Sequence, residues 1–80
     1  MGTATVRITG ERLRAMADNG MNLYLTPGAS APYWASSRQF AYDECVATPW
    51  DVLRANGYED VDDPDGDEIL EIEVEVIDPL

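Results

Sequence analysis

Alternating apolar and polar positions mark both ends of the chain as β-strands. In residues 3–9, Ala4, Val6 and Ile8 alternate with threonines and an arginine. This period of two, with β-branched residues on both faces, predicts a half-buried strand. The same period recurs over residues 68–78 and predicts a long final strand. Its inward face would consist of Leu70, Ile72, Val74 and Val76, and its outward face of Ile69, Glu71, Glu73, Glu75 and Ile77.

Between these strands the period changes. Leu13 and Met16 are spaced as on a helix within residues 11–18, a segment rich in good helix formers. We expect the helix to stop at Asn19-Gly20, with Gly20 in a left-handed conformation. The same pair is typical of a type I′ hairpin, so a strand in place of the helix is an alternative. Residues 21–26 alternate again and predict a second strand.

Residues 33–46, which follow a loop predicted at Pro27–Pro32, fit two structures. A helical stripe would consist of Trp34, Arg38, Ala41 and Cys45. One face of a strand would instead consist of Phe40, Tyr42, Glu44 and Val46. We interpret this segment as a helix.

The clearest local signal begins at Thr48. Its hydroxyl is suited to cap a helix, Pro49 suits the first helical position, and Asp51 complements the positive end of the helix dipole. The short helix is expected to turn Trp50 and Leu53 toward the core.

These elements predict a single α+β domain over residues 1–80. We expect a small, mainly antiparallel sheet of about three strands, with a long C-terminal strand, packed with two or three short helices. A type I turn is predicted at residues 63–66. The first and last strands are expected to pair, because Arg7 would then have glutamates opposite it. A chain of 80 residues with a single cysteine has a small core and no internal disulfide, which leaves a homodimer as a way to bury more surface.

The net charge of −11 is carried by the last third of the chain. Residues 1–54 hold five acids and five arginines, whereas residues 55–80 hold eleven acids and no base. Such a block of like charge repels itself and creates a long-range field. We predict that it binds a basic partner protein. The predicted contact residues are Glu59, Asp60, Asp62, Asp63, Asp65, Asp67, Glu68, Glu71, Glu73 and Glu75.

The composition offers little for catalysis, and we predict neither enzymatic activity nor a cofactor. The chain has no histidine, the usual general base near neutral pH. Cys45 is expected to be a small buried hydrophobe. The acidic segment resembles an EF-hand loop with Gly66 at position six, but Val61 and Ile72 then occupy the ligand positions one and twelve. We therefore expect no dedicated metal site, and only loose cation binding by residues 60–67 as an alternative.

The charge argues against direct binding of nucleic acid, which needs a basic surface. On a strand, Glu71, Glu73 and Glu75 would lie about 6.6 Å apart on one face. One DNA strand carries a phosphate about every 3.4 Å along the helix axis, a density that the row approaches when the acids of residues 60–68 are added. We expect a cytoplasmic protein, since no signal peptide or membrane span is recognisable and disulfides are absent.

In its small size, its charge asymmetry over Glu59–Asp78 and its lack of catalytic motifs, the chain resembles the small acidic inhibitors encoded by phages and mobile elements. These are the anti-CRISPR and DNA-mimic proteins. The resemblance covers the character of the whole chain and rests on no shared motif, so no residue role carries over. It implies a protein that acts in the cytoplasm of a bacterial host, docks on a basic DNA-binding groove, such as that of a CRISPR surveillance complex, and keeps DNA out. Two other functions stay open: an adaptor or antitoxin-like module that binds another basic protein, and a cation-binding domain.

Overall fold

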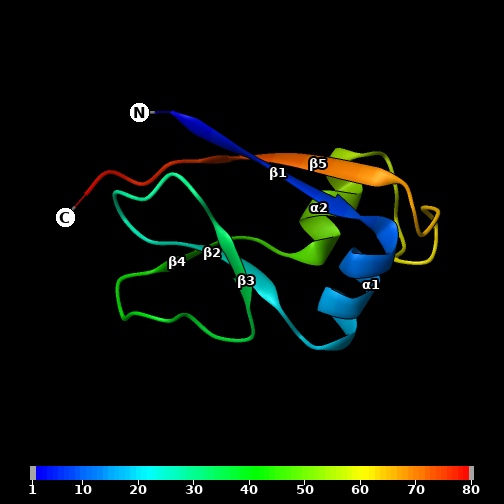
Figure 1. Ribbon diagram of the computed structural model, residues 1–80, viewed down its shortest axis with the longest axis horizontal. Coiled ribbons are helices and arrows are strands. Elements are labelled where there is room, and N and C mark those ends of the chain that lie inside the picture. The colour runs from blue at the N-terminus through cyan, green and yellow to red at the C-terminus, as the bar shows by residue number, and fades with distance from the viewer. Residues whose placement is uncertain (1, 80) are drawn as a thin grey trace.

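The computed structural model describes residues 2–79 and has an α+β fold (Figure 1). In chain order its elements are β1 (Thr3–Thr9), α1 (Gly10–Asp18), β2 (Asn22–Leu25), β3 (Tyr33–Ala35), β4 (Glu44–Ala47), α2 (Pro49–Ala55) and β5 (Ile69–Glu75). β1 pairs with β5 in a two-stranded antiparallel sheet, and a three-stranded antiparallel sheet has the order β3-β2-β4. The predicted α+β class and long final strand are confirmed, whereas the expectation of one sheet is wrong, because β2 finds its partners in two short strands instead of in β1 or β5.

β1 and β5 pair along their full length, with Arg7 opposite Glu71. Their even-numbered residues point inward and their odd-numbered residues outward, as the alternation predicts. The buried inward residues are Ala4, Ile8, Leu70 and Val74. Ile72, at the centre of β5, is half-buried. The pairing and the facing of the first and last strands are thus confirmed.

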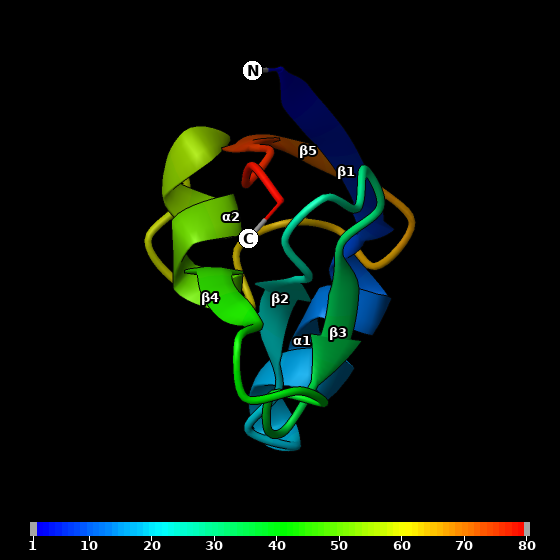
Figure 2. The ribbon, with the colours of Figure 1, turned by 90° about the vertical axis from the view of Figure 1, so that its left-hand side faces the viewer.

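The core lies between the inner face of the β1–β5 pair and the rest of the chain. Figure 2 shows this pair at the top and the three-stranded sheet below it. One core cluster consists of Ile8, Leu13, Val52, Leu53 and Leu70. The other consists of Ala4, Leu23, Ala47 and Val74. Trp34 and Ile72 pack against both clusters and so join them into one core.

Local signals set the ends of both helices. The Thr9 hydroxyl caps α1 by accepting a hydrogen bond from the Arg12 backbone N–H over 3.3 Å. Gly20, just after α1, has a φ of 66°, which confirms the predicted left-handed stop. Among residues 2–79, no helix is both long and apolar enough to cross a membrane.

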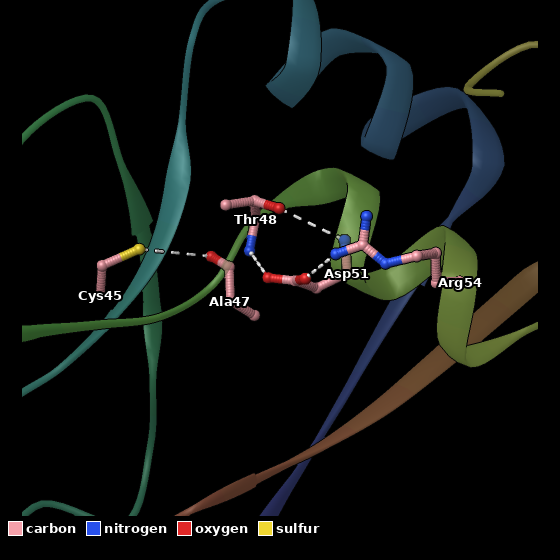
Figure 3. A network of polar contacts seen from close by, with 5 residues as sticks. All are labelled: Cys45, Ala47, Thr48, Asp51 and Arg54. Carbon is pink, nitrogen blue, oxygen red and sulfur yellow. Dashed lines mark hydrogen bonds and ion pairs between the residues drawn. The ribbon is translucent and has the colours of Figure 1, made fainter. Parts of the chain in front are cut away.

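α2 begins with a reciprocal cap between Thr48 and Asp51 (Figure 3). The Thr48 backbone N–H donates to Asp51 Oδ2 over 2.8 Å, and the Asp51 backbone N–H donates to the Thr48 hydroxyl over 3.3 Å. The hydrogen bond from Thr48 and the nearby charge of Arg54 hold the pKa of the Asp51 carboxyl below its ordinary value, although partial burial opposes them. The predicted cap is therefore confirmed.

The prediction that Trp50 lies in the core is wrong, because its side chain is 47% exposed. Pro49, Val52 and Leu53 are the buried residues of α2 and share one face of the helix. With 3.6 residues per turn, Trp50 is rotated about 100° from Pro49 and therefore lies beside that face. The prediction for Leu53 is confirmed.

The interpretation of residues 33–46 as a helix is also wrong. The segment forms β3 and β4, joined by a loop that the buried Asp43 organises. Asp43 Oδ2 accepts hydrogen bonds from the Tyr33 hydroxyl and, over 3.2 Å, from the Phe40 backbone N–H. Burial raises the pKa of the Asp43 carboxyl, but these hydrogen bonds outweigh it and hold that pKa below its ordinary value. Tertiary contacts thus override the helical spacing of the side chains.

The predicted turn at residues 63–66 is displaced. Hydrogen bonds close turns on either side of it, from the Asp63 N–H to the Asp60 carbonyl over 3.1 Å and from the Glu68 N–H to the Asp65 carbonyl over 3.2 Å. Pro64 lies between the two turns and is fully buried. Burial of this proline accounts for the shift, because it draws the middle of the segment into the fold.

Candidate acidic interface

The ten acids predicted to bind a partner occupy two adjoining segments. The acidic loop, residues 58–68 between α2 and β5, carries Glu59, Asp60, Asp62, Asp63, Asp65, Asp67 and Glu68; β5 carries Glu71, Glu73 and Glu75. All are exposed except Glu68, which is half-buried. In Figure 1 the acidic loop is the yellow segment at one end of the molecule, and β5 runs from it in orange toward the other end.

Backbone contacts anchor the acidic loop to the start of α1. The Gly10 N–H donates to the Glu68 carbonyl over 2.9 Å, and the Glu11 N–H donates to the Gly66 carbonyl over 3.0 Å. These are N–H groups that a helix start leaves without a partner inside the helix. Gly10 also has no room for a side chain, since a Cβ there would lie 2.2 Å from the Asp65 carbonyl oxygen. The loop is therefore held against α1 in spite of its charge.

Two carboxylates of the acidic loop also hold the conformation of the loop backbone by accepting hydrogen bonds from its N–H groups. Asp63 Oδ2 accepts hydrogen bonds from the N–H groups of Glu59 over 3.3 Å and of Asp60 over 3.1 Å. Asp60 Oδ1 accepts a hydrogen bond from the Asp62 N–H over 3.3 Å. Such short-range bonds from aspartate to the backbone are typical of turns. Asp60 and Asp63 therefore shape the loop as well as charging it.

Glu68 is fixed at the junction of the acidic loop and β5. The Tyr58 hydroxyl donates to both carboxylate oxygens of Glu68, each 2.7 Å away. This hydrogen bond raises the pKa of the Tyr58 hydroxyl, and burial and the nearby negative charges of Glu68, Asp65 and Asp63 add to the effect. The ring of Tyr58 packs against the core, so Glu68 is tied to the rigid part of the fold.

The structure brings arginines to two of the ten acids. Arg7 Nε lies 2.6 Å from Glu71 Oε1 across the β1–β5 pair, and Arg14 Nε lies 4.0 Å from Asp62 Oδ1. The other eight acids take part in no ion pair within residues 2–79. The predicted row on β5 is therefore uneven: Glu71 is neutralised, whereas Glu73 and Glu75 face threonines of β1.

Glu44 belongs to this surface although the sequence interpretation missed it. A groove of about 420 Å³ runs between β4 and β5 and is lined by Glu44, Val46, Glu73, Val74, Glu75, Val76 and Ile77. Glu44 thus adds a third carboxylate to Glu73 and Glu75. The strand alternative for residues 33–46, which places Glu44 and Val46 on one face, is the sequence signal that points to Glu44.

Cys45 is exposed, so the expectation of a buried cysteine is wrong. Its Sγ lies 3.7 Å from the Ala47 carbonyl oxygen (Figure 3). β4 is an edge strand, and only its last two residues reach the core, which leaves Glu44 and Cys45 in solvent.

The chemistry available to this surface is that of carboxylates. Among residues 2–79, no group of three or more cysteine, aspartate or glutamate side chains is placed to hold a metal ion. Carboxylates accept strong hydrogen bonds from arginine and lysine, which makes a basic protein surface the natural counterpart. Comparison of the chain with models of known families, with curated proteins and with solved structures gives no match.

Proposed function

We propose that this protein is an acidic inhibitor that docks on the basic DNA-binding surface of another protein, such as a CRISPR surveillance complex, and blocks the access of DNA. The observation that carries the proposal is the acidic loop itself. It is pinned to α1 and to Tyr58, and most of its carboxylates point into solvent without an arginine partner. A fixed array of like charges is costly to hold together, and a partner of opposite charge relieves that cost.

Carboxylates can take the place of phosphates on such a surface. An arginine binds either group through two parallel hydrogen bonds. Glu73 and Glu75 lie two residues apart on β5, a spacing of about 6.6 Å that equals roughly two phosphate steps of one DNA strand. The anchored backbone also means that little conformational freedom is lost on binding.

Electrostatic attraction predicts a characteristic salt dependence. Opposite charges steer the encounter, so association is expected to be fast at low salt and to slow as salt screens the charges. DNA and this protein would compete for the same arginines and lysines. Duplex DNA is therefore expected to release the captured partner.

The test captures the partner from a bacterial extract on the immobilised protein and then measures its DNA binding as this protein is added. We expect DNA binding to fall toward zero. The double variant Glu73→Gln/Glu75→Gln should inhibit about tenfold less well, a loss of ~1.4 kcal/mol. The control Asp18→Asn removes a carboxylate from the exposed C-terminal end of α1, away from the acidic loop, and should inhibit like the wild type.

Two results would count against the proposal. A partner that binds DNA unchanged at saturating protein is not inhibited, and the adaptor alternative then takes its place. Equal effects of the double variant and its control would mean that only the overall charge matters and that β5 is not part of the interface.

A further inference from the structure

The two outer edges of the β1–β5 sheet expose different backbone groups. Hydrogen bonds flank the sheet at both ends, from the Val76 N–H to the Gly2 carbonyl and from the Gly10 N–H to the Glu68 carbonyl, each 2.9 Å. In an antiparallel ladder, hydrogen-bonded pairs alternate with non-bonded pairs. The register therefore directs the backbone N–H and C=O groups of even-numbered residues toward the partner strand. Odd-numbered residues direct theirs to the outer edges.

The outer edge of β5 is covered by other parts of the chain. β5 lies between β1 and α2 (Figure 2). The side chain of Asn56, just after α2, donates to the Glu71 carbonyl over 2.9 Å and accepts from the Glu71 N–H over 3.4 Å. Farther along, the Gly28 N–H donates to the Ile77 carbonyl over 2.8 Å. This edge is thus protected against pairing with another strand.

The outer edge of β1 has no such cover. Within residues 2–79, no hydrogen bond from outside the β1–β5 pair reaches the backbone of Thr3, Thr5 or Arg7. All three residues are exposed. The strand is seven residues long and contains no proline, no inward charge and no irregularity of register, which are three of the usual devices that keep edge strands apart; its one charged side chain is Arg7, which pairs with Glu71.

We propose that β1 pairs with β1 of a second copy of this chain, antiparallel and about a two-fold axis at Val6. The result is a continuous four-stranded sheet in the order β5-β1-β1-β5. The inference goes beyond the proposed function and does not depend on it. The even-numbered apolar residues of both copies would then line one inner face, and the odd-numbered residues one outer face.

The register follows from overlap and charge. With the axis at Val6, all seven residues of β1 pair, and Arg7 of each copy lies opposite Thr5 of the partner subunit. A shift of two residues in one direction would place Arg7 opposite Arg7 of the partner subunit, and like charges directly opposite each other destabilise a sheet. A shift in the other direction shortens the pairing. The centred register is therefore the favoured one.

Charge also selects this edge for self-association. Two copies with a net charge of −11 repel each other, and the repulsion is weakest where neither copy presents acids. β1 contains no acid and one arginine, whereas pairing through β5 would bring together Glu73 and Glu75 of both copies. In the proposed dimer these glutamates form two rows on one face, separated by three strand spacings or about 14 Å.

The test measures mass by sedimentation and amide exchange by NMR over a range of protein concentrations. We expect a dimer that strengthens as sodium chloride rises, because salt screens the repulsion between the copies. The N–H groups of Thr5 and Arg7 should exchange fast at low concentration and become protected as the dimer forms. Those of Val6 and Ile8 should stay protected throughout, because they bond to β5.

Variants locate the contact. Thr5→Pro removes an N–H that points to the second copy and should weaken the dimer at least about tenfold, while the circular dichroism spectrum stays native. Arg7→Glu places an acid on the same edge without proline and should act likewise. The control Glu73→Pro makes the equivalent change on the other edge and should leave the dimer intact. A monomer at all concentrations up to about 1 mM, or a dimer that Thr5→Pro and Arg7→Glu leave unchanged, would overturn the proposal.

Discussion

Replacing Leu70 with alanine tests whether β5 turns its even-numbered side chains into the core. Leu70 is fully buried, in a cluster that also contains Ile8, Leu13, Val52 and Leu53. Truncation of a buried leucine costs about 2–5 kcal/mol, because the lost burial of apolar surface adds to the cost of the cavity left behind. At about 0.05–0.15 kcal/mol per residue, a domain of this size has a free energy of unfolding near 8 kcal/mol. Leu70→Ala is thus expected to remove about 3 kcal/mol, more than a third of the total.

Urea denaturation measures this loss directly. With an m value of about 1 kcal/mol/M for a small domain, the midpoint should fall by about 3 M. The matched control is Ile69→Ala at the neighbouring position, where the side chain is 63% exposed and the expected change is within about 0.5 kcal/mol. Ile72→Ala should fall between the two, since Ile72 is half-buried. If Ile69→Ala destabilised the protein more than Leu70→Ala, the facing of β5 would be wrong.

Three further outcomes follow from the geometry. Gly10→Ala should lower the melting temperature markedly, because the added Cβ would collide with the Asp65 carbonyl. The control Gly2→Ala should not lower it, because the space around Gly2 is open. Equal melting curves of the two variants would contradict the close contact at Gly10. The lowered pKa of Asp51 means that its carboxylate contributes stability above the unfolded-state pKa of about 3.9, and that this contribution is lost as pH falls through the lower folded pKa. The variant Asp51→Asn should therefore have a smaller free energy of unfolding than the wild type at neutral pH. As pH falls, this free energy should decrease less in the variant than in the wild type, which acid-unfolding curves of the two proteins would show. The melting temperature should rise with sodium chloride, since a Debye length of about 10 Å at 0.1 M screens repulsion within the acidic loop; a flat response would mean that the fold already balances these charges.

The parts of the fold that the sequence predicts are those with strong local patterns. Seven residues of strict alternation identify β1, and alternation broken only by the exposed Ile69 identifies β5. The glutamates of β5 opposite Arg7 indicate the pairing of the two strands. The Thr48 cap needs only residues within one helical turn. Such signals depend on residues that are close in the chain, so tertiary contacts rarely change the secondary structure that they specify.

The parts that the sequence misses depend on distant contacts. The sequence of residues 33–46 fits both a helical and a strand pattern, and the choice between them is made by distant contacts. The loop between β3 and β4 is set by the contact of Tyr33 with Asp43, ten positions away. In the candidate interface, the exposure of the acids can be predicted from the sequence, because eleven acids without a base in residues 55–80 cannot be paired within that segment and unpaired charges stay in solvent. The contact of Asp62 with Arg14 and the approach of Glu44 to β5 require the fold itself.

The pairing of β1 with β5 has a consequence for how the protein is made. Partners in this sheet are 60 to 72 positions apart in the chain, and each core cluster takes one member from β5, Leu70 in one and Val74 in the other. The core of a nascent chain on the ribosome stays open until residues 69–75 have left the exit tunnel, and α1 and α2 are too short to be stable without it. Contacts of such long range make folding slow relative to helical proteins of the same size. Folding is therefore expected to wait for β5, with the apolar face of β1 unprotected until β5 arrives.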